Sequence, residues 1–152
     1  MQFRTGFSAL LMLIFLSGCS SPSPTIAILT DFGWDDPYAG AMQGAMLSIN
    51  PDAKLLTITH SSPDFDIREA SFMLAAAARE FPKGSIFLSV IDPGVGSSRR
   101  PVILETLNGK YFVGPDNGIF TDAIKAFGLK QAVKISNVLW TRQSNMISTT
   151  FH

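Results

Sequence analysis

Short apolar runs alternate along this chain with longer segments whose apolar residues recur at helical spacing. The runs that predict β-strands are residues 26–30, 54–59, 85–90, 102–106, 111–114 and 132–135. The segments that predict helices are residues 36–49, 66–80 and 117–127. Strand and helix alternate over the first 90 residues, which predicts an α/β fold with a mostly parallel sheet covered by helices.

Local signals indicate where several of these elements begin and turn. Asp36-Pro37 combines an N-cap aspartate with proline at the first helical position. Asp66 and Glu69 have the three-residue spacing of a capping box. Asn108-Gly109, between two apolar runs, is a strong signal for a β-hairpin. Two helix starts and one hairpin are therefore predicted at defined positions.

The amino terminus reads as a targeting segment. Arg4 precedes the apolar run of residues 7–16, which is too short to span a bilayer as a helix. Leu16-Ser17-Gly18-Cys19 resembles a bacterial lipobox, and a Ser/Pro-rich tether follows it. We expect a signal peptide at 1–18, a lipidated Cys19 with its tether at 19–24, and an α/β domain at 25–152. The implied location is the bacterial cell envelope, lipid-anchored at the outer membrane and facing the periplasm. A free cysteine after an ordinary signal peptide is the alternative.

Charge and cysteine content exclude several functions. Twelve Lys and Arg balance twelve Asp and Glu, and no basic stripe is visible, so nucleic acid is not an expected partner. A single cysteine excludes an intrachain disulfide and a thiolate metal cluster. The glycine-rich motifs of dinucleotide and P-loop sites are absent from the sequence.

Polar residues follow three of the predicted strands. Asp31 follows the first, His60 and Asp64 the second, and Asp92 the third, before Pro93-Gly94 and the pair Arg99-Arg100. The carboxyl ends of parallel strands share one edge of a sheet, where ligands bind in open α/β folds, so these groups are expected to converge. Each also has a structural interpretation: the aspartates as caps of turns or helices, and His60 as a hydrogen-bonded core residue.

A metal-dependent hydrolase is one alternative. Its candidate ligands are oxygen and imidazole groups of the usual type: Asp31, Asp35, Asp36, His60, Asp64 and Asp92. None has the tight helical spacing that makes a metal motif specific, so no metal is the favoured interpretation.

A series of short motifs, in order, resembles one family closely. They are residues 29–33 with 38–40, 49–53, 58–60, 81–85, 92–96 with 99–100, 115–118 and 148–152. Together they cover residues 25–152 and resemble the S-adenosylmethionine (SAM) hydroxide adenosyltransferase family, which is related to the fluorinase and chlorinase enzymes. The resemblance implies SAM as substrate, no cofactor, and attack of water or hydroxide on C5′ of the ribose to give adenosine and methionine.

The resemblance also implies residue roles. It assigns the catalytic set to Asp92, Arg99 and His152, with the aspartate orienting the attacking oxygen in a positive field from the other two. Halogenating relatives carry a tyrosine or glycine where this chain has Asp92, and a carboxylate repels halide, so hydrolysis is favoured. An Asp92–Arg99 ion pair that only stabilises the loop is the alternative.

For binding, the resemblance places the ribose hydroxyls on Asp31. It places Asp36 and Phe65 in the nucleoside and methionine pocket, and Asn117 near the site. Family members add a C-terminal β-barrel domain and form trimers, with the ligand between subunits. The barrel is missing here, so we expect impaired activity from this chain alone. A lipoprotein that binds adenosine or SAM without turnover remains an alternative.

Overall fold

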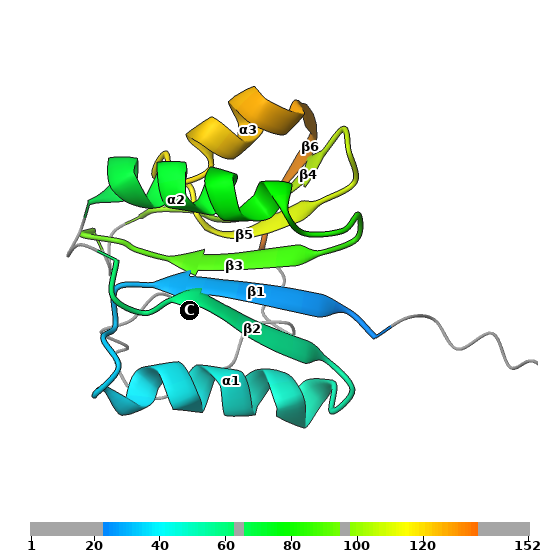
Figure 1. Ribbon diagram of the computed structural model, residues 1–152. Coiled ribbons are helices and arrows are strands. Elements are labelled where there is room, and N and C mark those ends of the chain that lie inside the picture. The colour runs from blue at the N-terminus through cyan, green and yellow to red at the C-terminus, as the bar shows by residue number, and fades with distance from the viewer. Residues whose placement is uncertain (1–22, 63–65, 95–97, 137–152) are drawn as a thin grey trace, which may run out of the picture.

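The computed structural model describes residues 23–62, 66–94 and 98–136. A six-stranded sheet has helix α1 on one face and helices α2 and α3 on the other (Figure 1). The elements in chain order are β1 (Thr25–Thr30), α1 (Pro37–Ile49), β2 (Lys54–Thr59), α2 (Ile67–Arg79), β3 (Ile86–Val90), β4 (Pro101–Thr106), β5 (Tyr111–Pro115), α3 (Thr121–Phe127) and β6 (Leu129–Lys134).

The strand order is β2-β1-β3-β5-β4-β6. The first four of these strands are mutually parallel, whereas β4 and β6 run antiparallel to their neighbours. The predicted mostly parallel sheet is thereby confirmed. Pro101 at the start of β4 pairs with Pro115 at the end of β5. The entry to β4 therefore lies at the same edge as the exits of β1, β2, β3 and β5.

The core fills the space between the sheet and helices α2 and α3. Phe87 of β3 stacks on Phe112 of β5, with ring centroids 4.8 Å apart. Helix α2 presents Leu74 and small side chains such as Ala70 and Ala78 to this layer, and all three are fully buried. Small residues let the helix lie close to the strands, and each buried large side chain contributes about 1.5–3 kcal/mol. This layer holds the strand ends in place.

The predicted caps and hairpin are confirmed. Asp36 accepts a hydrogen bond from the Tyr38 N–H at 2.8 Å, and Asp66 accepts one from the Glu69 N–H at 2.9 Å. The hairpin between β4 and β5 closes through a hydrogen bond from the Gly109 N–H to the Thr106 carbonyl. Gly109 has φ +76°, a conformation that glycine adopts without steric cost.

Two elements differ from the prediction by more than one residue. The helix expected from residue 117 begins at Thr121, because the Asn117 side chain accepts a hydrogen bond from the Ile119 N–H at 3.1 Å and Gly118 has φ +101°. This side-chain turn competes with helix formation. The last strand is Leu129–Lys134 rather than residues 132–135. Its residues are all exposed, so the apolar pattern that marks a buried strand is lacking.

Within the described ranges, no helix has the length and apolarity needed to cross a bilayer. The expected signal peptide, Cys19 and most of the tether lie outside those ranges.

Candidate functional site

One edge of the sheet collects the candidate residues. Asp31, His60 and Asp92 follow β1, β2 and β3, and Asp116-Asn117 lies where β5 ends. Arg99 and Arg100 immediately precede β4. Strands of opposite direction therefore bring carboxylates and guanidinium groups to one edge, hereafter the site edge.

Asp92 and Arg99 form an ion pair at the site edge. The Asp92 side chain is 1% exposed and that of Arg99 is 27% exposed. The same oxygen, Asp92 Oδ1, accepts hydrogen bonds from the Arg99 guanidinium and from the Gly94 N–H, the latter at 2.9 Å. A carboxylate that is buried and paired in this way has a fixed orientation.

Gly94 is required by the position of Arg99. A Cβ atom built on Gly94 lies 2.2 Å from Arg99 Nη2 and 2.8 Å from Arg99 Cζ. The guanidinium group therefore packs directly against the glycine backbone. This close approach explains the Pro-Gly turn after Asp92.

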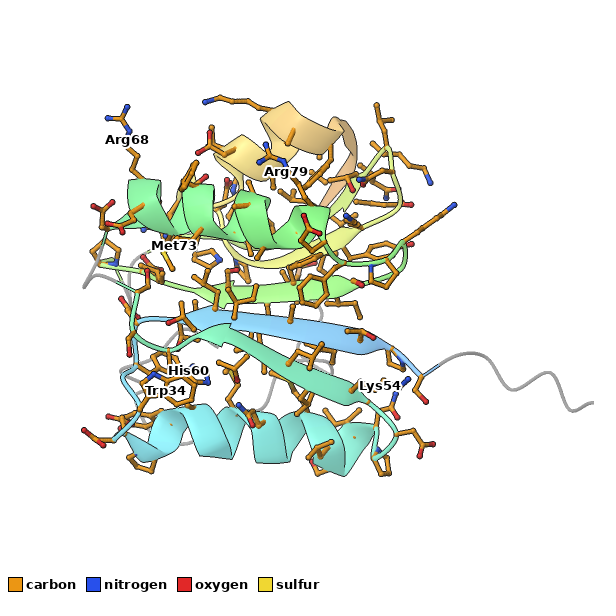
Figure 2. All side chains as sticks on the ribbon, in the orientation of Figure 1. Trp34, Lys54, His60, Arg68, Met73 and Arg79 are labelled. Carbon is orange, nitrogen blue, oxygen red and sulfur yellow. The ribbon has the colours of Figure 1, made fainter. Side chains whose placement is uncertain are left out.

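His60 is a buried residue with several hydrogen-bonding partners. Its Nδ1 lies 2.8 Å from Thr30 Oγ1, and its Nε2 lies 3.4 Å from Thr57 Oγ1. Gln43 of α1 also approaches Nε2, at 3.5 Å. The Trp34 ring packs edge-on against the imidazole, with centroids 5.0 Å apart (Figure 2). Burial lowers the pKa of His60, which favours the neutral imidazole. These surroundings support the interpretation of His60 as a hydrogen-bonded core residue.

Backbone hydrogen bonds join the loops that follow β1 and β2. The Gly33 N–H donates to the His60 carbonyl at 2.7 Å, and the Ser62 N–H donates to the Thr30 carbonyl at 3.4 Å. These bonds flank Asp31, which is half-buried. The His60 loop therefore supports the position of Asp31.

Some of the remaining candidates lie within the described residues and others lie outside them. Asp36 caps α1, so its carboxylate is already engaged with a backbone N–H. Asn117 Nδ2 donates to the Ile91 carbonyl at 2.7 Å, next to Asp92. Phe65, Asp64, His152 and Cys19 lie outside the described residues. Of the three proposed catalytic residues, the structure therefore describes Asp92 and Arg99 but not His152.

The sequence patterns did not predict the second ion pair, between Arg100 and Asp116. The Asp116 N–H also donates to the Arg100 carbonyl at 2.9 Å. The only available signal was the Asp-Asn-Gly turn composition of residues 116–118, which indicates a turn but not its partner.

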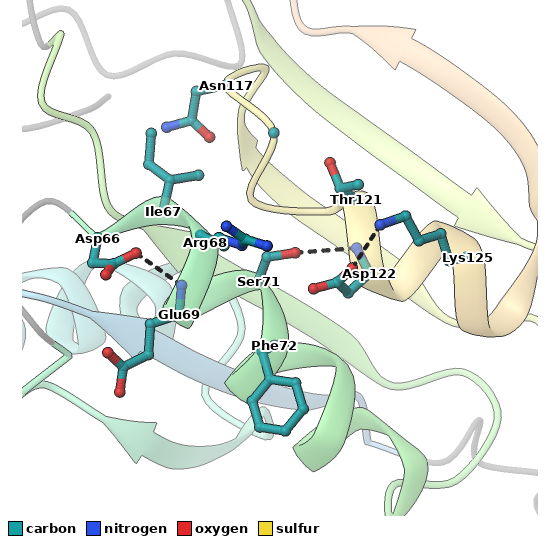
Figure 3. Close-up of a pocket in the computed structure, with 11 residues that line it drawn as sticks. Asp66, Ile67, Arg68, Glu69, Ser71, Phe72, Asn117, Thr121, Asp122 and Lys125 are labelled. Carbon is teal, nitrogen blue, oxygen red and sulfur yellow. Dashed lines mark hydrogen bonds and ion pairs between the residues drawn. The ribbon is translucent and has the colours of Figure 1, made fainter.

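A cavity of about 780 Å³ lies beside the site edge, between the start of α2 and α3 (Figure 3). Asn117 is on its border, whereas Asp31, Asp92 and Arg99 are not among the residues that line it. Several of its polar groups are already engaged with one another: Asp122 pairs with Lys125, and the Asp122 N–H donates to Ser71 Oγ. The cavity therefore does not enclose the ion-paired aspartate, and Asn117 is the candidate site residue on its border.

Among the described residues, no group of three or more His, Cys, Asp or Glu side chains is arranged to hold a metal ion. Asp64, one of the candidate ligands, lies outside those residues.

Comparison with known proteins gives consistent matches. Residues 26–152 match the model of the SAM hydroxide adenosyltransferase N-terminal domain. A curated relative from Methanocaldococcus jannaschii, named (R)-S-adenosyl-L-methionine hydrolase, is 40% identical over 131 residues, covering 84% of this chain and 48% of the relative. A fluorinase from an Actinoplanes species is 28% identical over 137 residues, covering 76% of this chain and 46% of the fluorinase.

Solved structures agree. A conserved protein from Thermotoga maritima superposes with a TM-score of 0.79 at 35% identity, covering 82% of this chain and 48% of that protein. The chain thus spans about half the length of the relatives it matches. The family match covers nearly all of the chain beyond residue 25 and includes the loop that holds Asp92 and Arg99. The chain belongs to the SAM hydroxide adenosyltransferase family.

Proposed function

We propose that this chain takes part in the hydrolysis of SAM to adenosine and L-methionine. Family membership and the name of the Methanocaldococcus jannaschii relative support this reaction. The observation that carries the proposal is the buried, oriented carboxylate of Asp92, held by Arg99 at the edge where an α/β sheet binds ligands.

The chemistry is a displacement at C5′ of the ribose. The oxygen of water or hydroxide forms a bond to C5′ as the C5′–S bond breaks, and both electrons of that bond pass to sulfur. The sulfonium becomes the neutral thioether of methionine, and the water proton passes to a basic group or to solvent. Because the sulfonium is already a good leaving group, no general acid is required.

Asp92 accepts a hydrogen bond from the attacking water and aligns it with C5′. Arg99, together with His152 in its protonated form, supplies a positive field that stabilises hydroxide character on the oxygen. A carboxylate at this position repels chloride and fluoride, so hydrolysis is favoured over halogenation. Asp31 binds the ribose hydroxyls as a bidentate acceptor, and Asp36, Phe65 and Asn117 border the nucleoside and methionine pocket.

The proposal also covers location and assembly. A lipid on Cys19 anchors the domain in the cell envelope, at the outer membrane and facing the periplasm. When a second domain is present, three copies associate and place the ligand between subunits.

The test measures adenosine and methionine released from SAM, together with SAM affinity by calorimetry. The proteins are the 152-residue chain and the same chain joined to the remaining half of the Methanocaldococcus jannaschii relative. We expect equal amounts of both products, and Asp92→Ala should lower turnover by about a hundredfold or more while affinity changes little. Glu105→Gln, which alters a carboxylate on β4 away from the site edge, should leave turnover unchanged.

Binding of SAM or adenosine by both forms without release of products would instead indicate a ligand-binding lipoprotein. Neither binding nor release in either form would overturn the proposal.

A further inference from the structure

The loop that carries Asp92 and Arg99 is held at both of its ends by two adjacent residues of another loop. At its start, the Ile91 carbonyl accepts a hydrogen bond from Asn117 Nδ2 at 2.7 Å. At its end, the Arg100 carbonyl accepts one from the Asp116 N–H at 2.9 Å. From these contacts we propose that Asp116-Asn117 is a clamp that sets the spacing of Asp92 and Arg99, with Asn117 as a positioning residue for the proposed reaction.

On the side of β5, the clamp acts beyond the end of the β3–β5 ladder, whereas β1 pairs with β3 as far as Val90. The register between β3 and β5 runs from Ile86–Tyr111 to Leu88–Val113, which ends short of Ile91. On the other side, β4 pairs with β5 from Pro101 onward, just beyond Arg100. The two clamp bonds therefore add hydrogen bonds beyond the ends of these ladders, at Ile91 just before the loop and at Arg100 just after it. The nearest ladder positions are Val90, which pairs with Thr30 of β1, and Pro101, which pairs with Pro115 of β5, so the clamp bonds each add one residue toward the loop.

Asn117 has the local rigidity that this role requires. Its Oδ1 accepts from the Ile119 N–H at 3.1 Å, while its Nδ2 donates to Ile91. Ile119 is fully buried and belongs to the hydrophobic core. Both ends of the Asn117 amide are thus engaged, one with Ile119 and one with Ile91, and both of these residues belong to the hydrophobic core. The Asn117 side chain therefore joins the turn before α3 to the residue next to Asp92.

The two clamp residues contribute unequally. The side chains of Arg100 and Asp116 are 63% and 43% exposed, so their ion pair is screened by solvent and contributes little. The contribution of Asp116 therefore comes from its backbone N–H. That of Asn117 comes from a partly buried side-chain amide facing a carbonyl. Asn117 is accordingly the residue whose substitution tests the clamp.

This inference rests on the proposed function for its catalytic consequence, but its structural part is measured without substrate. Asn117→Asp keeps the acceptor for the Ile119 N–H and removes the donor to Ile91. Amide hydrogen exchange by NMR on the 152-residue chain reports the Gly94 N–H, which donates to Asp92. We expect Gly94 exchange to accelerate about tenfold, the equivalent of one net hydrogen bond. The amides of Ile119 and of Gly109, in the distant hairpin, should stay within about twofold.

Two further variants complete the set. Asn117→Ala removes both side-chain bonds and should accelerate both Gly94 and Ile119. Asp116→Asn keeps the backbone N–H and should leave Gly94 unchanged. Where SAM turnover is measured, Asn117→Asp should lower kcat with little change in KM.

Unchanged Gly94 exchange in both Asn117 variants would overturn the clamp, as would equal acceleration of the Gly94, Ile119 and Gly109 amides, which indicates general loss of stability. A weaker affinity for SAM with unchanged Gly94 exchange would instead make Asn117 a substrate contact. Faster Gly94 exchange in a chain that neither binds nor hydrolyses SAM would support the clamp and reject the proposed function.

Discussion

The guanidinium group of Arg99 occupies the space in which any side chain on Gly94 would have to lie. The two residues flank the turn after Asp92, and both donate hydrogen bonds to the same carboxylate oxygen. The ion-pair geometry therefore depends on the absence of a single methyl group.

Gly94→Ala should impair the site more than the fold. The added Cβ meets only the flexible end of Arg99, so the guanidinium shifts while staying close to the Asp92 carboxylate, and the cost in stability is smaller than in Arg99→Met below. Misplacement of a catalytic group by about 1 Å can lower the rate by about a hundredfold. We expect adenosine release to fall between about tenfold and a hundredfold, with a thermal midpoint close to that of the parent chain.

Gly109→Ala is the matched control for that variant. Gly109 has φ +76°, and an added Cβ would lie 2.6 Å from Lys83 Cε, at the hairpin away from the site edge. We expect a loss of about 1–2 kcal/mol of stability with unchanged activity per folded molecule. Lower stability with unchanged activity in Gly94→Ala, together with lower activity in Gly109→Ala, would contradict the role given to Gly94.

Arg99→Met should destabilise the chain, because it leaves the buried Asp92 carboxylate without its cation. A fully buried pair costs about 3–5 kcal/mol when one partner is removed. Arg99 is partly exposed, so we expect about 1–3 kcal/mol in urea unfolding. Adding Asp92→Ala should recover part of this loss, and the double-mutant cycle gives the coupling between the two residues. Full activity in the double variant would show that the pair only stabilises the loop.

Stability should fall with decreasing pH because of His60. Burial places the folded-state pKa of His60 below its ordinary value of 6.5. Below pH 6.5, His60 therefore binds a proton more readily in the unfolded chain than in the folded chain. The stability that neutral His60 contributes above pH 6.5 is lost as the pH falls toward its folded-state pKa. The slope for one proton is at most about 1.4 kcal/mol per pH unit.

Thermal unfolding between pH 5 and 7.5 measures this effect. His60→Gln should flatten the dependence, and His152→Gln should leave it largely intact. Equal slopes in His60→Gln and the parent chain would refute the assignment.

Removing metal ions should leave adenosine release unchanged. Two of the candidate ligands are already engaged: Asp92 with Arg99 and the Gly94 N–H, and Asp36 with the Tyr38 N–H. The comparison is activity before and after dialysis against a chelator, with magnesium and zinc added back separately. Loss on chelation followed by recovery with either ion would favour the metal-dependent alternative.

Signals carried by neighbouring residues predicted the fold well. The caps at Asp36 and Asp66 and the hairpin at Asn108-Gly109 depend on contacts within a few residues, so the sequence contains them directly. The exposed strand β6 was only partly predicted, because pairing with β4 rather than burial defines it.

The sequence proposes the candidate site as a set of residues, including the Asp92–Arg99 pair, but not the contacts between distant segments. Sequence placed Asp92 and Arg99 in one loop, whereas the bond from Asn117 to Ile91 joins residues 26 positions apart and has no local signature. His60 shows the opposite case. Its position after β2 suggested a ligand-facing group, but its partners Thr30, Thr57 and Gln43 come from three separate elements.

β2 and β6 are the two outermost strands of the sheet. Among the described residues, each therefore has one side along which its backbone groups pair with no other strand. Each of these strands carries exposed lysines, namely Lys54 on β2 and Lys130 and Lys134 on β6. Positive charge on an open edge opposes the addition of a further strand from another molecule. Lys130 is paired with Glu105, so Lys54 and Lys134 carry the charge that opposes such addition. These lysines lie far from Asp92 in the chain, so they place no constraint on the charged groups around Asp92.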